Sequence, residues 1–400
     1  MSIIFRYLNI LFFVVIAHIA FADTSAQNSI KNEAAQAIEL FTENHAIHAV
    51  YAIADNNKVV IRGAQGFADL DRNQRLVVTQ QMPIASGTKP FTAAAILMLK
   101  DRKLLNLNDS VAKYLNEESG MWRDRKVPSW AHQVKIHHLL SHSSGIPEYV
   151  FAFKMDFKRT QSENNKDILH FVASKDLEFT PGSKCSYNNT GYMILGMIIE
   201  NVTGQRYADF MQKELFERHD MQDTRIASFS EAIDVQLGKS HILPTRYYVV
   251  PTGNTNPKFV PVGSEIVVAP NADGGAISTV DDLIKWNGAL HTGKILSKKS
   301  YQQMITKYFP TTSSGGYDTH IGYGMYISKT PDGTTIYHHE GRALGARSDN
   351  GYLPKYNASY AIMSNMMLHI PKELASKIDL TKPENQLDIL YFRNAILEAL

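Results

Sequence analysis

The alternation of apolar and polar residues predicts strands near both ends of the chain. Residues 30–45 have the apolar spacing of an amphipathic helix. Two apolar and β-branched runs then flank Asp55-Asn56-Asn57-Lys58, a pattern that predicts a β-hairpin. Towards the other end, turn residues 329–333 join the runs YGMYIS and TTIYHH, a pattern that predicts a second hairpin. The run ASYAIMSN predicts one more strand after it. The final residues, ENQLDILYFRNAILEAL, predict a closing helix.

The middle of the chain has a different pattern. Residues 101–235 are largely helical in pattern, and residues 236–275 predict loops and short strands. A nearly all-apolar helix is expected from about Thr190 to Val202, with Gly204 as its C-cap, and a helix that is apolar on every side is buried. The pattern therefore predicts an α+β fold in which both chain ends complete one sheet and a mainly helical lobe is inserted between them.

The first residues predict a secretory signal peptide. Arg6 precedes an apolar run that ends in Ala20-Phe21-Ala22, a small-residue cleavage pattern. The alternative is an uncleaved membrane anchor, although the run is short for a span and is interrupted by Asn9 and His18. We expect cleavage after Ala22 and an exported protein, periplasmic or secreted, that could associate with the cell envelope. The remaining residues, 23–400, are expected to form one domain, with the sheet lobe over about 30–85 and 275–400 and the helical lobe over about 86–274.

Composition narrows the function only by exclusion. The chain has 400 residues, of which 44% are hydrophobic, as expected for a folded protein with an ample core. Its 41 basic and 39 acidic residues give a net charge of +2, which offers no case for nucleic-acid binding. Cys185 is the single cysteine, so an intrachain disulfide is excluded, and a lone cysteine is more often a small packed residue than a nucleophile.

The first candidate for chemistry is the pair Ser86 and Lys89. Residues three apart share one face of a helix, and Pro90 fits the first turn of a helix that begins here. Lys89 is the only charged residue between Arg75 and Lys100, and an ammonium in so apolar a run is costly unless it has a task or partners. A helix N-terminus favours developing negative charge, so Ser86 is a candidate nucleophile activated by the neighbouring amine.

A second Ser-x-x-Lys sequence has a simpler interpretation. Ser110 precedes Lys113, and Lys113 stands four residues before Glu117, the spacing of an ordinary exposed helix pair. We interpret this copy as structural.

Two further motifs carry groups that suit acyl transfer. Tyr187-Asn188-Asn189 lies just before the buried helix, where asparagine is a good N-cap. The tyrosine phenol could also act as a base if neighbouring cations lowered its pKa, and the amide beside it could bind a substrate carbonyl. In His339-Glu340-Gly341, at the predicted end of a strand, Gly341 would let the backbone approach a ligand closely. The N–H groups of Arg342 and Ser86 could then bind an oxyanion together.

Other histidines invite alternatives that we rank lower. His291-Thr292-Gly293 repeats the His-x-Gly pattern, but it closes a predicted helix in which Gly293 is a suitable C-cap. A metal site is conceivable around His138 and His142, which are four residues apart, but no carboxylate or cysteine completes the set, and we predict no metal. The cluster as a whole contains His132, His137, His138 and His142.

The order Ser-x-x-Lys, Tyr-x-Asn and His-x-Gly resembles the serine β-lactamase and penicillin-binding-protein superfamily. The chain is most similar to its branch of class C β-lactamases, D,D-carboxypeptidases and related esterases. The stretches LLSHSSGIPEY, FTPGSKCSYNNTGYMILG and NADGGAISTVDDLIKW also resemble segments of this family. The resemblance covers about residues 30–370 and implies a β-lactamase/transpeptidase-like fold, an antiparallel sheet flanked by helices.

The resemblance implies a role for each motif residue. Ser86 resembles the acylated nucleophile, and Lys89 resembles the amine that shares its proton. Tyr187 resembles the phenol or phenolate that acts first as base and later as acid. Asn189 resembles the amide that holds the substrate or Lys89. No metal or organic cofactor is implied.

The third motif departs from that of classical β-lactamases. His339 stands where they carry lysine, and a histidine that is mostly neutral at pH 7 gives less positive charge for a substrate carboxylate. Arg342 or Arg347 could restore that charge. Gly341 and the N–H of Arg342 resemble the part of the motif that helps to bind the oxyanion.

We therefore expect an exported serine hydrolase that forms an acyl-enzyme on Ser86. Its partner would be a small-molecule or peptide substrate with a scissile amide or ester, and the enzyme would be a D,D-carboxypeptidase-like peptidase or an esterase. The alternatives are a true class C-like β-lactamase, or a catalytically silent penicillin-binding or sensor protein.

Overall fold

The structure is a computed structural model. It describes residues 32–43, 47–122, 126–150, 152–156, 158–228, 230–231, 243–251, 257–262, 271–312, 318–330, 332–370 and 388–398. The predicted signal peptide, residues 1–22, lies outside these residues. So do most of the loops of the region 236–275. Within the described stretches, no helix has the length and apolar character needed to cross a bilayer.

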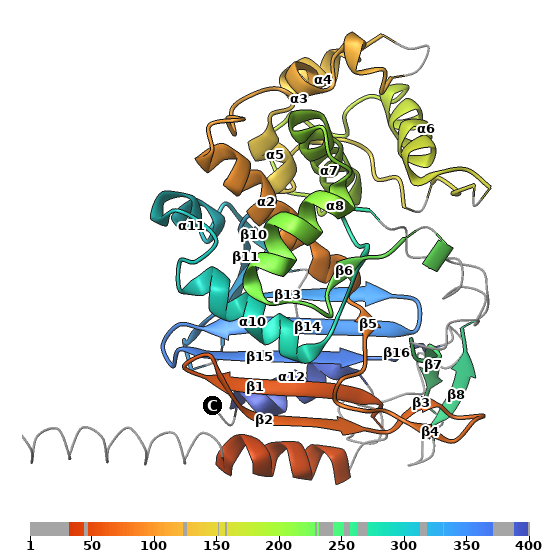
Figure 1. The fold of residues 1–400 in the computed structure, drawn as a ribbon, viewed down its shortest axis with the longest axis vertical. Coiled ribbons are helices and arrows are strands. Elements are labelled where there is room, and N and C mark those ends of the chain that lie inside the picture. Colours follow the sequence, from red (N-terminus) through yellow and green to blue (C-terminus); the bar gives the residue numbers. More distant parts are fainter. Residues whose placement is uncertain are drawn as a thin grey trace, which may run out of the picture.

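An eight-stranded antiparallel sheet forms the base of the molecule (Figure 1). Its strand order is β10-β11-β12-β13-β14-β15-β1-β2, so the two ends of the chain meet where β1 pairs with β15. This confirms the α+β prediction of a sheet completed by both termini. The strands are β1 (Ala49–Asp55), β2 (Lys58–Gln65), β10 (Phe309–Thr311), β11 (Asp318–Ile321), β12 (Tyr326–Lys329), β13 (Thr335–Ala343), β14 (Ala346–Leu353) and β15 (Ala358–Ser364).

Both predicted hairpins are present. Asn56 and Asn57 join β1 to β2 with φ of 48° and 62°, the left-handed region that asparagine tolerates better than most residues. The second hairpin pairs β12 with β13. The strand predicted to end at His339 instead continues through Gly341 to Ala343, so the third motif lies inside β13.

Three small sheets accompany the large one. The one nearest the candidate nucleophile has the order β5-β9-β6 and joins the segment that enters the helical lobe to the segment that leaves it. The short strands are β3 (Phe67–Asp69), β4 (Gln74–Arg75), β5 (Met82–Pro83), β6 (Arg225–Ile226), β7 (Tyr247–Val250), β8 (Lys258–Pro261), β9 (Ala276–Ser278) and β16 (Met366–Leu368).

The inserted lobe is mainly helical and lies above the sheet (Figure 1). The predicted apolar helix is α7, with Asn188 as N-cap and Gly204 in the left-handed conformation at its end, and its residues Thr190 to Ile199 are all buried. The helical segments of this lobe are η1 (Ala85–Thr88), α2 (Lys89–Asp101), α3 (Val111–Tyr114), η2 (Glu117–Ser119), α4 (Ser129–Gln133), α5 (Ile136–Leu140), α6 (Gln161–Ala173), α7 (Asn189–Thr203), α8 (Tyr207–Met211), η3 (Gln212–Phe216) and η4 (Glu217–His219).

Helices also cover both faces of the sheet. The N-terminal helix, predicted over 30–45, is present over residues 32–43. Helix α10 (Val280–His291) and the closing helix α12 (Ile389–Glu398) pack against the sheet, and α11 (Lys298–Met304) packs against α2.

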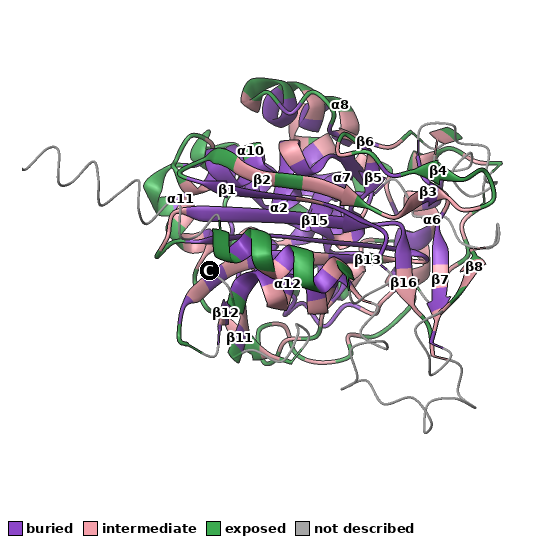
Figure 2. Cartoon of the chain, turned by 90° about the horizontal axis from the view of Figure 1, so that it is seen from below, coloured by how far each residue is buried: buried purple, intermediate pink, exposed green. Residues whose placement is uncertain are grey.

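The sheet separates two apolar cores. Along β15, Ala361 and Met363 join the core shared with α2, α7 and α10, while Tyr360 and Ile362 join the core under α12 and the N-terminal helix. Strands β1 and β15 are buried on both faces (Figure 2), whereas α12 alternates buried with partly buried residues. The alternation of side chains along each strand therefore decides which face a polar residue serves.

Candidate active site

Ser86 lies in the helical turn η1, which leads directly into α2. Ala85, just before it, has φ of 46°, an unusual value for a residue with a side chain and one that active-site turns often contain. The turn is fixed by Thr88, whose hydroxyl donates to the Ala85 carbonyl at 2.7 Å and accepts from the Ala276 N–H at 3.0 Å. Pro90 occupies the first turn of α2, as predicted. Ser86 is half-buried, so its hydroxyl can meet a substrate.

Lys89 is completely buried and its ammonium is surrounded by three oxygens. Nζ lies 3.1 Å from Ser86 Oγ, 2.7 Å from Asn189 Oδ1 and 2.7 Å from the main-chain oxygen of Asp273. Burial lowers the pKa of Lys89 to about 8, although the negative charges of Asp273 and Glu148 raise this pKa in part. The buried ammonium therefore has partners, and it can release a proton close to neutral pH.

Glu148 fixes the orientation of Asn189. Its Oε2 accepts from the Asn189 main-chain N–H at 2.7 Å and from the Asn189 side-chain amide at 3.1 Å. Because the amide nitrogen faces Glu148, the amide oxygen must face Lys89. Asn188, rather than Asn189, caps α7, accepting from the Gly191 N–H at 2.7 Å. The two asparagines of the motif thus have separate tasks.

Tyr187 reaches the same point from the end of its loop. Its hydroxyl interacts with the Ser86 side chain, and Lys89 Nζ lies 4.9 Å from the centre of its ring. The ring stacks on His142 at 4.4 Å between centroids. Burial raises the pKa of Tyr187 well above its usual value. The condition set for a phenolate base, a pKa lowered by cations, is therefore not met, and Tyr187 is a neutral phenol.

His339 and Gly341 complete the convergence from β13. The His339 ring centroid lies 6.3 Å from that of Tyr187, and the imidazole is buried. A side chain on Gly341 would place Cβ 1.9 Å from the Ile84 oxygen. Glycine therefore lets β13 approach the backbone just before Ser86, whereas we had expected it to make room for a ligand.

The protonation of His339 follows from its contact with a main-chain oxygen. Nδ1 lies 2.6 Å from the carbonyl of Glu340, and a carbonyl only accepts, so Nδ1 carries the proton and Nε2 has the lone pair. Burial, with help from the charge of Lys89, lowers the pKa of His339 to about 3. The third-motif residue is therefore neutral at physiological pH.

The two arginines proposed to supply positive charge do not face this site. Arg347 is buried and binds Glu340 and Asp388 through Nη2 at 3.3 and 3.0 Å. Arg342 is exposed, and strand alternation places its side chain on the face of β13 that carries Glu340, opposite His339 and Gly341. Neither side chain is placed to restore the missing charge. The oxyanion role of the Arg342 and Ser86 N–H groups stays a prediction.

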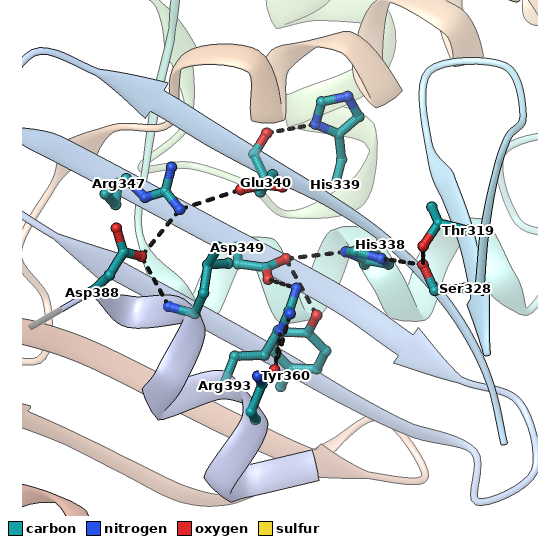
Figure 3. Close-up of polar contacts among 12 residues, drawn as sticks. Thr319, Ser328, His338, His339, Glu340, Arg347, Asp349, Tyr360, Asp388 and Arg393 are labelled. Atoms are coloured by element: carbon teal, nitrogen blue, oxygen red, sulfur yellow. Dashed lines mark hydrogen bonds and ion pairs between the residues drawn. The ribbon is translucent and has the colours of Figure 1, made fainter. Parts of the chain in front are cut away.

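On its other face, β13 is tied to the C-terminal helix by charged side chains (Figure 3). His338 Nε2 lies 2.8 Å from Ser328 Oγ, and its Nδ1 is 3.6 Å from Asp349, which pairs with Arg393 of α12 at 3.0 Å. Glu340 binds Arg347, which in turn binds Asp388 at the start of α12. The residues on either side of His339 are thus anchored below the sheet.

The other residues considered for chemistry, Lys113, His291 and Cys185, have structural roles. Lys113 pairs with Asp109 at 2.9 Å and not with Glu117, because α3 ends at Tyr114. His291 stacks on Tyr352 at 4.2 Å. Burial raises the pKa of the Cys185 thiol to about 11, which makes it a poor nucleophile.

The histidine cluster does not meet at one point. His137 contacts the Tyr323 hydroxyl, His138 accepts from the Lys135 N–H, and His142 accepts from the Asn188 N–H. Across the described residues, no three His, Cys, Asp or Glu side chains are arranged to hold a metal ion.

Sequence reasoning missed two carboxylates beside Lys89. Glu148 and Asp273 lie in loops, 41 residues from Asn189 and 184 residues from Lys89 respectively. Neither position has a periodic pattern or a motif spacing that would reveal it. Both residues lie in stretches that resemble segments of the family, LLSHSSGIPEY and NADGGAISTVDDLIKW. This resemblance was the one signal in the sequence that could have pointed to them.

Comparisons with known proteins identify relatives of the chain. The sequence model of the family described as Beta-lactamase matches residues 34–376. The chain is 27% identical over 310 residues to penicillin-binding protein 4* of Bacillus subtilis (strain 168), covering 76% of this chain and 64% of that protein. It is 30% identical over 218 residues to protein flp of Staphylococcus aureus (strain NCTC 8325 / PS 47), covering 52% of this chain and 42% of that protein. The chain thus spans less than two thirds of the length of these relatives.

Solved structures show the same fold. The octameric penicillin-binding protein homologue from Pyrococcus abyssi superposes with a TM-score of 0.68 at 25% identity, covering 91% of this chain and 80% of that one. D-amino acid amidase from Ochrobactrum anthropi SV3, complexed with L-phenylalanine amide, gives a TM-score of 0.70 at 22% identity, covering 93% and 98%. With the family match over most of its length and this fold, the chain belongs to the beta-lactamase family of serine hydrolases, with penicillin-binding protein homologues among its relatives.

Proposed function

We propose that the protein is an exported serine hydrolase that forms an acyl-enzyme on Ser86 and acts on small esters or amides. Of the two activities expected from the sequence, we rank an esterase above a D,D-carboxypeptidase-like peptidase. The observation that carries the proposal is the buried Lys89 ammonium, 3.1 Å from Ser86 Oγ and held by two carbonyl oxygens. Export rests on the predicted signal peptide, residues 1–22.

The hydrogen bonds around Lys89 account for activation of the nucleophile. A neutral amine has two N–H donors and one lone pair. The Asn189 and Asp273 carbonyl oxygens only accept, so they take both donors. The lone pair is then left for the third neighbour, the Ser86 hydroxyl. Loss of one proton therefore converts Lys89 into a base aimed at Ser86, and its pKa of about 8 makes that state accessible.

Tyr187 suits the return of the proton to the leaving group. Its hydroxyl interacts with Ser86 and its high pKa keeps it a neutral donor. In the proposed cycle, Ser86 Oγ attacks the substrate carbonyl and its proton passes to Lys89. The N–H groups of Ser86 and Arg342 bind the oxyanion, and Tyr187 relays the proton to the departing amine or alcohol. Water then attacks the ester bond to Ser86 and restores the serine hydroxyl.

The charges around the site favour neutral substrates over carboxylates. His339 is neutral, and the side chains of Arg342 in β13 and Arg347 in β14 lie on the far face of the sheet. Glu148 and Asp273 add negative charge near Lys89. We therefore rank uncharged esters and amino-acid amides above β-lactams and peptides that end in a free carboxylate. D-amino acid amidase as a fold neighbour supports the inclusion of D-amino acid amides.

A substrate panel on the purified chain tests the proposal. We expect turnover of short acyl esters or D-amino acid amides and slow turnover of nitrocefin and D-Ala-D-Ala peptides. Intact-protein mass spectrometry after treatment with a fluorophosphonate should show one adduct, which Ser86→Ala abolishes. Ser110→Ala is the matched control, because it removes the serine of the other Ser-x-x-Lys sequence, and its labelling should be unchanged.

Each alternative gives a different result. Rapid nitrocefin turnover would establish a β-lactamase. A stable adduct on Ser86 with no turnover of any substrate would favour a penicillin-binding or sensor protein. An adduct that survives Ser86→Ala would reject the assignment of the nucleophile.

A further inference from the structure

The buried carboxylate of Asp273 stands beside the proposed base. Its main-chain oxygen accepts from Lys89, and its side chain is 7% exposed. We propose that Asp273 is a positioning residue whose negative charge holds Lys89 in its ammonium form and sets the pH at which Ser86 becomes a nucleophile. The inference rests on the proposed role of Lys89 in the hydrolase.

The turn that carries Asp273 is fixed on several sides. The Ala272 carbonyl accepts from the Thr92 hydroxyl of α2 at 2.6 Å, and the Gly275 N–H donates to the Asn271 carbonyl at 2.8 Å. A Cβ on Gly274 would lie 3.6 Å from the carbonyl carbon of Ala85, so this turn packs against the residue that precedes Ser86. The turn, with the Asp273 main-chain oxygen that binds Lys89, therefore has a defined place beside the nucleophile.

One oxygen of this carboxylate is bound and the other is not. Oδ2 accepts from the Tyr149 hydroxyl at 3.1 Å. Oδ1 is buried and has no hydrogen-bond partner within the described part of the chain. A buried carboxylate with so few donors is costly unless a nearby cation compensates its charge. The cation that interacts with it most strongly is Lys89.

A second carboxylate belongs to the same group of charges. Glu148 accepts from the Tyr149 and Val150 N–H groups through Oε1 and from Asn189 through Oε2. All four of its acceptor positions are thus used, and its role is to hold Asn189. Asp273 differs because its hydrogen bond to Lys89 comes from its main-chain oxygen, and its side chain contributes a negative charge.

The other groups around Lys89 are uncharged at neutral pH. Burial keeps the pKa values of the imidazoles low and those of the phenols high. These groups are His142, His339, Tyr187, Tyr192 and Tyr149. The charge balance at Lys89 is therefore decided by Asp273 and Glu148, and the pKa of Asp273, raised by burial to about 6, leaves it ionised at pH 7.

The sign of the effect is definite. A nearby anion favours the charged form of a lysine, so its removal lowers the lysine pKa, by about one pH unit or more at close range. In Asp273→Asn, Lys89 should titrate at a lower pH than in the wild type. A residue with only a structural role would change the rate or the stability but would leave this midpoint in place.

The test is a direct titration of Lys89 by NMR in protein labelled with ¹³C at the lysine ε-carbons. The Lys89 signal is assigned by its loss in Lys89→Met. We expect the midpoint to fall by about one pH unit in Asp273→Asn. Asp282→Asn is the matched control: it also removes a buried carboxylate, but one that pairs with Lys285, and the Lys89 midpoint should stay unchanged.

A second variant covers the case in which Asp273→Asn does not fold. Asp273→Ala removes the same charge with a smaller side chain, so the Lys89 midpoint should move in the same direction by a similar amount. An unmoved midpoint in the folded variants, or an equal shift in Asp282→Asn, would overturn the inference. Because the titration needs no turnover, it is decided separately from the labelling of Ser86 that tests the proposed function.

Discussion

The ion pair between Arg393 and Asp349 allows a quantitative test of how α12 holds the sheet. Arg393 Nη1 lies 3.0 Å from Asp349 Oδ2, and both side chains are 0% exposed. The Tyr360 hydroxyl donates to the other carboxylate oxygen at 3.2 Å. Removal of one member of a buried pair leaves the other charge buried without its counter-charge, which costs about 3–5 kcal/mol. We therefore expect Arg393→Met to lower the free energy of unfolding by this amount at pH 7.

The pKa of Asp349 gives an independent magnitude. Burial raises it, but the charges of Arg393 and His338 outweigh burial and bring it from 3.8 to about 2. A difference of this size corresponds to about 2 kcal/mol of stabilisation. Because the folded-state pKa is the lower one, the stabilisation is complete above about pH 4 and is lost as the pH falls towards 2. This contribution to acid sensitivity should be absent in Asp349→Asn.

The assay is urea unfolding followed by circular dichroism for the wild type, Arg393→Met, Asp349→Asn and the double variant. The double variant buries no unpaired charge, so its loss should be smaller than the sum of the single losses. Arg206→Met is the control, since Arg206 pairs with Asp209 while 79% exposed and should contribute less than about 1 kcal/mol. Additive single losses, or a loss in Arg393→Met no larger than in the control, would refute the reasoning.

Two further predictions follow from the same geometry. Gly341→Ala places a methyl group against the Ile84 oxygen, so β13 must move away from Ser86. We expect labelling of Ser86 by a fluorophosphonate, followed by mass spectrometry, to slow at least about tenfold. The free energy of unfolding in urea should fall by about 1–3 kcal/mol. A second prediction concerns His291, whose pKa is lowered by burial from 6.5 to about 3. Below pH 6.5 the unfolded chain therefore binds a proton that the folded chain excludes. The free energy of unfolding should fall by about 2 kcal/mol between pH 6.5 and 5. His291→Gln should remove that part of the pH dependence, and an unchanged slope in urea unfolding would contradict this account.

Much of the fold was predictable because its signals are local. The two hairpins, the buried helix α7 and the start of α2 at Pro90 each follow from a short run of sequence. The convergence of the Ser86, Tyr187 and His339 segments was predicted from the order of three motifs.

The features that the sequence did not predict depend on contacts between residues far apart in the chain. The sequence predicted that Lys113 pairs with Glu117, but a helix of one turn does not reach that far. It also offered Arg347 as a substrate-binding charge, because nothing local shows which face of β14 carries this side chain. Alternation fixes that face only once the register with β13 is known.

That register links the candidate active site to the C-terminal helix. In β13, His339 and Gly341 face the Ser86 turn, while His338 and Glu340 face α12. A shift of one residue would exchange the two sets, placing the Glu340 carboxylate beside Ser86 and a side chain where only glycine fits. The ion pairs that tie the α12 face to Arg393 and Asp388 oppose this shift, since it would leave buried charges unpaired. Helix α12 packs on β14 and β15, and its charges help to fix the strand position on which the site depends.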